Sequence, residues 1–160
     1  ARRFAADPSG WFVMSGGFGV GKTHLAAAIA NAQHLNGQPV LFIVVPDLLD
    51  HLRATYSPTS NVSYDKRFEH IKRVPLLVLD DLGTQSATPW AREKLFQLFN
   101  YRYMAQLPTV ITLNDFEAVE NRLLERMMEM KAVGMGSMLD LSVPPFRGRG
   151  AAGDRGRRRN

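Results

Sequence analysis

A glycine-rich segment near the start of the chain constrains the fold most strongly. Residues 16–23 read GGFGVGKT, which matches the pattern G-x-x-x-x-G-K-[S/T] at every fixed position. The apolar run at residues 11–14 predicts a strand before it, and the alanine-rich stretch after it predicts a helix. A strand, a glycine turn and a helix in this order form a backbone cradle for phosphate groups. The segment therefore predicts an α/β fold with a nucleotide site, although a glycine turn that binds nothing would share this local pattern.

The residues of this loop have separate expected roles toward ATP. Glycines allow the tight turns that direct backbone N–H groups at phosphate oxygens, and Lys22 would add a positive charge near the β- and γ-phosphates. Thr23 would offer its hydroxyl to Mg²⁺. The predicted nucleotide-contacting residues are Gly16, Gly17, Phe18, Gly19, Val20, Gly21, Lys22, Thr23 and His24. Of these, the imidazole of His24 is interpreted as structural.

The rest of the chain alternates between strand-like and helix-like segments. Strands are predicted at residues 11–14, 40–45, 76–79, 109–113 and 137–143, with helices between them. This alternation predicts a parallel sheet covered by helices on both faces, with right-handed crossovers. The strand at 40–45 is expected to be buried on both faces, and the helix at 22–36 to bury Leu25, Ile29, Ala32 and Leu35.

Polar residues end two of the predicted strands. In a parallel sheet they would gather with the glycine loop at the carboxyl edge. Asp80 would hold Mg²⁺ together with Thr23, and Asp81 would orient or deprotonate the attacking water. Asn114 could hydrogen-bond the γ-phosphate or that water. The alternatives are that Asp81 caps the next loop, and that Asn114 or Asp115 caps the following helix.

Composition excludes several classes of protein. The 160 residues contain no cysteine, which removes disulfide scaffolds, thiolate catalysis and Cys-ligated zinc. No apolar run approaches the roughly 18 residues needed to span a bilayer, and no secretory signal is present. We therefore expect a cytoplasmic protein with no membrane partner. Because the chain begins with Ala1, we also expect that an upstream portion is missing.

The net charge of +5 comes from one end of the chain. Residues 147–160 contain six arginines and one aspartate, and the other 146 residues carry 14 basic and 14 acidic side chains. We expect an ATP-binding core at residues 1–146 and a basic Arg/Gly tail at 147–160. The tail either grips a nucleic-acid backbone without sequence preference, or is a disordered terminus or the product of an altered reading frame.

Three segments together resemble a known family. GGFGVGKTHLAAAIAN, LLVLDDLG and VITLN resemble the AAA+ ATPases of the bacterial helicase-loader type, which are DnaC-like and DnaI-like, and the related IstB-like transposition helper ATPases. The resemblance covers about residues 4–130. It implies a three-layer P-loop fold with sheet order 5-1-4-3-2 and no C-terminal helical lid. It also implies ATP at the subunit boundary of a ring or spiral, with a replicative helicase or a transposase as partner and single-stranded DNA as a further ligand.

The resemblance also implies an arginine that reaches the ATP of a neighbouring subunit. In the segment NRLLERM at residues 121–127, Arg126 is the better match and Arg122 the second. Their alternative is a solvated helical face, because glutamates are interleaved with them. Arg147 matches a second nucleotide sensor only faintly. Most AAA+ proteins have Glu where this chain has Asp81, so hydrolysis is expected to be slow and stimulated by a partner.

Two further classes of function stay open from the sequence. A small-molecule P-loop kinase would need an acceptor pocket and an arginine-bearing lid, and neither is legible in the sequence. A non-hydrolysing, ATP-gated adaptor would follow if Asp81 were too short to activate water. Helicase loading and assistance in transposition are not separated by these residues.

Overall fold

The computed structural model describes residues 1–55, 61–83 and 88–145 of the chain. The strands are β1 (Trp11–Ser15), β2 (Val40–Val44), β3 (Leu76–Leu82), β4 (Thr109–Leu113) and β5 (Gly136–Asp140). The helices are α1 (Arg2–Ala6), α2 (Lys22–Leu35), α3 (Val45–Thr55), α4 (Asn61–Arg73), α5 (Pro89–Met104) and α6 (Asn121–Ala132), with a 3₁₀ turn η2 (Phe116–Ala118).

The five strands form one parallel sheet in the order β2-β3-β4-β1-β5. Read from the other edge, this is the predicted order 5-1-4-3-2, so the prediction is confirmed. Strand β1 lies between β4 and β5, with Trp11 opposite Thr109 on one side and Gly136 on the other. The carboxyl ends of the strands therefore meet at one edge of the sheet, which is where the predicted site residues should gather.

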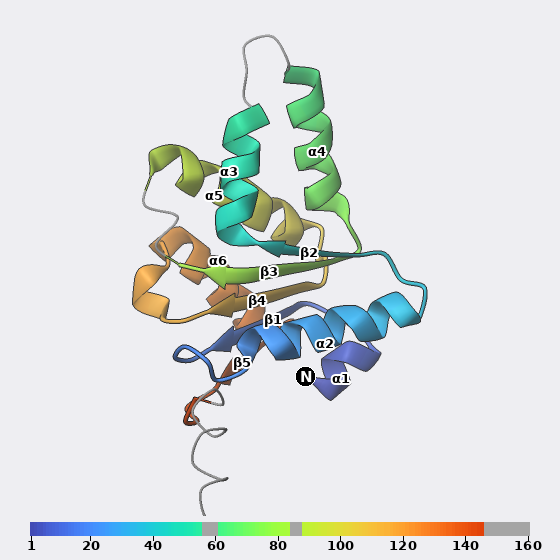
Figure 1. The fold of residues 1–160 in the computed structure, drawn as a ribbon, viewed down its shortest axis with the longest axis vertical. Helices are drawn as coiled ribbons and strands as arrows, with labels where there is room; N and C mark the ends of the chain where they lie inside the picture. Colours follow the sequence, from blue (N-terminus) through green and yellow to red (C-terminus); the bar gives the residue numbers. More distant parts are fainter. Residues whose placement is uncertain (56–60, 84–87, 146–160) are drawn as a thin grey trace, which may run out of the picture.

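Helices cover both faces of the sheet, as the alternating sequence predicts. Helices α1 and α2 lie on one face, and α3, α4, α5 and α6 lie on the other (Figure 1). Alternate residues of each central strand divide between the two cores: Leu77 and Leu79 pack with α3–α6, whereas Val78 packs with α2. Among the described residues, no helix follows β5. None of the described helices is both long and apolar enough to cross a lipid bilayer.

Helix α5 illustrates how local sequence sets an element that supports the site. Its N-cap is Thr88, whose hydroxyl accepts a hydrogen bond from the backbone N–H of Ala91 at 3.2 Å, and Pro89 occupies the first turn. Leu95, Leu98 and Phe99 are all buried, as predicted from their spacing. This apolar stripe fixes α5 against the sheet beside β4 and β1.

Several local predictions were wrong. Leu35 is 84% exposed, because α2 instead buries a face formed by Ala26, Ile29, Ala30 and Gln33. Strand β2 is an edge strand and is only partly buried, since no further strand covers its outer side. Strand β3 continues to Leu82 rather than ending before the acids, and β5 is shifted to Gly136–Asp140. Most of the predicted loop at residues 57–61 lies outside the described residues.

Candidate nucleotide site

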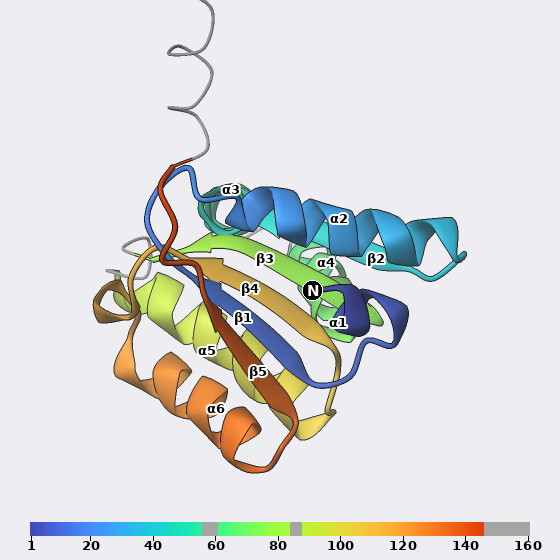
Figure 2. The same ribbon diagram turned by 90° about the horizontal axis from the view of Figure 1, so that it is seen from below.

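The glycine loop joins the carboxyl end of β1 to the first residue of α2, as the motif predicts. Gly16 has a φ of 141°, and a Cβ atom there would lie 2.7 Å from the carbonyl oxygen of Leu141. Gly21 has a φ of 101° and forms the N-cap of α2. Both positions require glycine, since side chains disfavour positive φ. The segment after β5 runs beside this loop (Figure 2). The first residue of the loop, Gly16, is therefore packed closely against the backbone of Leu141.

Lys22 is the first residue of α2, and all three N–H groups of its ammonium donate hydrogen bonds. Its Nζ donates to the carbonyl oxygens of Gly16 and Gly17 at 2.6 and 2.8 Å, and to Oδ1 of Asn114 at 2.9 Å. Desolvation by burial lowers the pKa of Lys22, and the negative charges at the end of β3 partly offset this effect. An anion entering the loop would supply the counter-charge that the neutral oxygens do not provide.

Asp80 and Thr23 come together from β3 and α2. The Thr23 hydroxyl lies 3.1 and 3.0 Å from the two carboxylate oxygens of Asp80, to which it donates. Asp80 is 5% exposed, so its carboxylate is held in a largely enclosed position. The two residues predicted to hold Mg²⁺ are therefore adjacent in the structure.

Asn114 bridges the loop to the second acid. While its amide oxygen accepts from Lys22, its Nδ2 donates to Oδ1 of Asp81 at 3.1 Å. Asp81 has a φ of 59°, which is uncommon for a residue with a side chain. The helical cap is made by Asp115, whose carboxylate accepts from the Glu117 N–H at 2.9 Å. Asn114 is thus turned into the site rather than onto the following 3₁₀ turn.

The donor set fits Mg²⁺. This ion prefers oxygen ligands and is usually held by one or two carboxylates together with substrate phosphates and water. A hydroxyl and a carboxylate already converge at Thr23 and Asp80, and the cluster of Lys22, Asp80 and Asp81 carries one positive and two negative charges. Across the described ranges, no group of three or more His, Cys, Asp or Glu residues could hold a metal by itself. The residues therefore fit a metal shared with phosphate oxygens.

Three other predicted residues make no described contribution to this cluster. Phe18 is 80% exposed at the loop, and His24 lies on the exposed side of α2. Arg147 and the rest of the basic tail lie outside the described residues.

The predicted trans-acting arginines lie on α6, apart from Lys22 of the same chain. The guanidinium of Arg126 lies 4.9 Å from the ring centroid of Tyr103, and its Nη1 donates to Glu129 at 2.5 Å. Tyr103 belongs to the last turn of α5, which leads to the amino end of β4, so Arg126 points away from the glycine loop. Arg122 stacks on Phe96 at 4.5 Å. Neither arginine serves the phosphate site of its own subunit in this conformation.

Sequence reasoning missed Thr112, which lies opposite both acids. It is 1% exposed on β4, and its hydroxyl donates to Oδ1 of Asp80 at 2.6 Å. The Thr112 hydroxyl oxygen also accepts a hydrogen bond from the backbone N–H of Asp81 at 2.9 Å. The available signal was a threonine within the otherwise apolar run 110–113.

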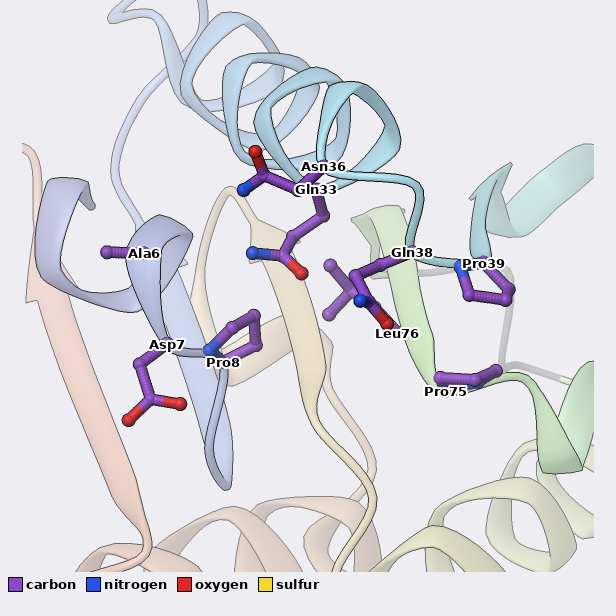
Figure 3. Close-up of a pocket in the computed structure, with 9 residues that line it drawn as sticks. All are labelled: Ala6, Asp7, Pro8, Gln33, Asn36, Gln38, Pro39, Pro75 and Leu76. Atoms are coloured by element: carbon purple, nitrogen blue, oxygen red, sulfur yellow. The ribbon is translucent and has the colours of Figure 1, made fainter.

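The amino edge of the sheet contains a cavity whose lining residues differ from those of the Lys22 cluster. It has a volume of about 350 Å³ and is lined by Ala6, Asp7, Pro8, Gln33, Asn36, Gln38, Pro39, Pro75 and Leu76 (Figure 3). Asp7 is the only titratable residue in this lining, and the buried amide of Gln33 donates to the carbonyl oxygen of Ala5 at 2.7 Å. The cavity is not part of the Lys22 cluster, which lies at the carboxyl edge.

The parallel sheet, the glycine loop, the paired acids and the strand-end asparagine define a P-loop nucleotide-binding protein of the AAA+ class. Among solved structures, the replication initiator DnaA bound to AMPPCP and single-stranded DNA is similar in fold, with a TM-score of 0.74 at 19% identity over 89% of this chain and 44% of that one. The crystal structure of DnaI is similar with a TM-score of 0.69 at 30% identity, over 90% of this chain and 79% of that one.

Within this class, the chain belongs to the family described as IstB-like ATP binding protein, which matches residues 7–130. The replicative helicase loader DnaC of Escherichia coli K12 is 31% identical over 139 residues, which is 86% of this chain and 56% of that protein. The corresponding DnaC of Buchnera aphidicola subsp. Schizaphis graminum is 30% identical over 137 residues. The chain thus spans 56% of the length of these relatives.

Proposed function

We propose that this chain binds Mg²⁺-ATP and hydrolyses it as part of the DNA replication machinery, in the manner of a helicase loader. The observation that carries the proposal is the continuous link Lys22–Asn114–Asp81, which joins the glycine loop to the second acid. The Thr23–Asp80 pair lies beside it. The similarity to DnaC proteins supports the replication role.

In this proposal the glycine loop binds the phosphates and Lys22 neutralises their charge. Lys22 would exchange its hydrogen bonds to neutral carbonyl oxygens for hydrogen bonds to phosphate oxygens. The buried ammonium would then have a negatively charged partner. Bound Mg²⁺ would neutralise charge between the β- and γ-phosphates. Thr23 and Asp80 are the residues that would hold it.

Asp81 and Asn114 would act on the attacking water. Asp81 presents a carboxylate at the sheet edge that can accept a proton or a hydrogen bond from water. Asn114 can release Lys22 to the nucleotide while keeping Asp81 oriented through its Nδ2. Because Asp81 is one methylene shorter than the Glu of most AAA+ proteins, we expect slow hydrolysis that a partner accelerates.

We further propose that Arg126 acts in trans, in a ring or spiral of subunits. Arg126 points away from the phosphate site of its own chain, which is compatible with a contact to the ATP of a neighbouring subunit. An arginine suits this task because its planar, permanently charged group can bind two phosphate oxygens. The expected partners are a replicative helicase and single-stranded DNA, in the cytoplasm.

A mixing experiment tests this arrangement. Arg126→Ala should bind ATP normally but lose hydrolysis by about 10³-fold or more. Lys22→Ala should not bind ATP. If the arginine acts in trans, a mixture of the two inactive variants should recover ATP hydrolysis. A Lys22→Ala subunit still carries Arg126, which can act on the ATP bound by a neighbouring Arg126→Ala subunit. Arg122→Ala is the matched control and should retain activity. No recovery in the mixture would contradict trans action.

A role as an IstB-like transposition helper is the second candidate, and the family match favours it. The two roles share the ATP site and differ in partner. Stimulation of ATP hydrolysis by a replicative helicase would support the first role, and stimulation by a transposase would support the second. Phosphate transfer to a nucleoside would instead indicate a kinase, and ATP-dependent assembly without turnover would indicate an adaptor.

A further inference from the structure

Strand β3 contains a β-bulge at its two acidic residues. Leu79 pairs with Ile111 and Leu82 pairs with Leu113, so Asp80 and Asp81 together face one residue of β4, which is Thr112. Bulges of this kind place two residues opposite one and redirect the side chains around them. The positive φ of 59° at Asp81 marks the point where β3 departs from regular geometry.

The bulge sets the direction of both acids. In a regular strand, Leu82 would face the same side as Asp80, yet Leu82 packs with Leu77 and Leu79 in the core under α3–α6. Asp80 points to the other side, toward Thr23 of α2. The extra residue, Asp81, is left to project along the sheet edge, where Asn114 reaches its carboxylate.

One hydroxyl holds this bulge. Thr112 Oγ1 donates its proton to Asp80 Oδ1 at 2.6 Å and accepts the Asp81 N–H at 2.9 Å, so it binds both residues of the bulge at once. Thr112 is 1% exposed and Asp80 is 5% exposed, so water has little access to replace these bonds. A buried donor or acceptor left without a partner is costly.

We propose that Thr112 is a positioning residue for the metal and the attacking water. Its hydroxyl holds the carboxylate of Asp80 against Thr23 and fixes the backbone of Asp81 so that its side chain meets Asn114. The proposal rests on the proposed function, because it concerns how this site holds Mg²⁺-ATP. Without the hydroxyl, Asp80 would lose a charge-assisted bond and the Asp81 N–H would lose its partner.

The chain offers a matched control in Thr109 on the same strand. Thr109 is also 1% exposed, and its hydroxyl donates to the Leu107 carbonyl at 3.0 Å and accepts from Arg102 Nε at 2.8 Å. It therefore makes two buried hydrogen bonds, as Thr112 does, but at the amino edge. A purely structural effect of losing a buried threonine hydroxyl should appear equally in Thr109→Val and Thr112→Val.

The test uses the whole chain and a fluorescent ATP analogue, titrated in EDTA and then with Mg²⁺. Thr112→Val should keep its affinity in EDTA, while the Mg²⁺ concentration that half-saturates the complex rises about 10- to 100-fold. Thr112→Ser, which keeps the hydroxyl, should remain within about threefold of the unmutated protein. Thr109→Val should lower the melting temperature without changing the Mg²⁺ requirement.

Four outcomes would overturn the proposal. An unchanged Mg²⁺ requirement in Thr112→Val would remove the positioning role while leaving the proposed function intact. An equal change in Thr109→Val, or failure of Thr112→Ser to restore the requirement, would show that only packing is involved. Absence of nucleotide binding by the unmutated protein would instead contradict the proposed function, and the role of Thr112 with it.

Discussion

Two buried cations lie at opposite edges of the sheet, and their surroundings differ. Lys22 at the carboxyl edge donates to two carbonyl oxygens and an amide oxygen. Arg102 at the amino edge is 1% exposed and donates to the carbonyl oxygens of Lys72, Val74 and Pro108 and to the Thr109 hydroxyl. Both cations are thus bound by neutral oxygens.

The difference lies in what surrounds those oxygens. Lys22 sits in a glycine loop beside two carboxylates and a strained residue, whereas the groups that bind Arg102 belong to strand ends and helix ends that it joins. Burial lowers the pKa of Arg102 to about 10, so the side chain remains charged at neutral pH. A buried cation therefore indicates a binding site only where a ligand can replace the groups that it contacts. The groups around Arg102 belong to the fold itself, so we interpret Arg102 as structural.

The largest effect that separates the two edges is expected from Arg102→Leu. This change removes four hydrogen bonds and leaves buried carbonyl groups without a donor, so the free energy of unfolding should fall by at least about 3 kcal/mol. Denaturant unfolding measures this. Arg92→Leu, on the same helix but only half-buried, should change it by less than about 0.5 kcal/mol. Weakened ATP affinity in the folded fraction of Arg102→Leu would break the distinction between the edges.

A pair of glycines gives the next largest contrast. Gly16→Ala would force a Cβ to within 2.7 Å of the Leu141 oxygen, so the loop must shift, at a cost of about 1–3 kcal/mol and with a loss of ATP affinity. Gly37 follows α2 with a φ of 73° and open space around it, so Gly37→Ala should cost only about 1 kcal/mol. Thermal unfolding and ATP titration together check both variants. Equal ATP affinity in the two would contradict the assigned role of the loop.

The smallest effect on ATP binding is expected from deletion of the basic tail, residues 147–160, which lie outside the described residues. Residues 1–146 carry every predicted site residue except Arg147, which matches a second nucleotide sensor only faintly, so deletion of 147–160 should leave ATP affinity unchanged. If the arginines of the tail contact DNA, DNA affinity and its dependence on salt should both decrease. Retention of both properties would exclude the tail as a DNA site.

The sequence predicted much of this fold because its signals are local. The glycine loop has fixed spacing, and the stripe Leu95, Leu98 and Phe99 follows helical periodicity, so both could be placed without tertiary information. The strand order came from the family resemblance. The order implied by the resemblance placed β2 at an edge of the sheet, but its partial exposure was missed, because an apolar run has the same composition at an edge as at the centre of a sheet.

The candidate site was predictable in its residues but not in its connections. Lys22, Thr23, Asp80, Asp81 and Asn114 were all expected, and the structure brings them together at one edge. The bulge was not predictable, because it depends on which residues of β3 and β4 pair. Thr112 was missed for the same reason, and Arg102 was missed because most of its partners are backbone carbonyls that carry no sequence signal.

The central claim is that the glycine loop with Lys22 binds the phosphates of ATP. An equilibrium titration of Mg²⁺-ATP with the unmutated chain and Lys22→Ala tests it most directly. We expect saturable binding by the unmutated chain and a loss of affinity of about 100-fold or more in Lys22→Ala, since charge-assisted contacts to phosphate would be lost. The variant should remain folded, because Gly16 and Asn114 are only half-buried and Gly17 is exposed, so water can replace Lys22 at the oxygens that it binds. Equal affinity in the two proteins would contradict the account.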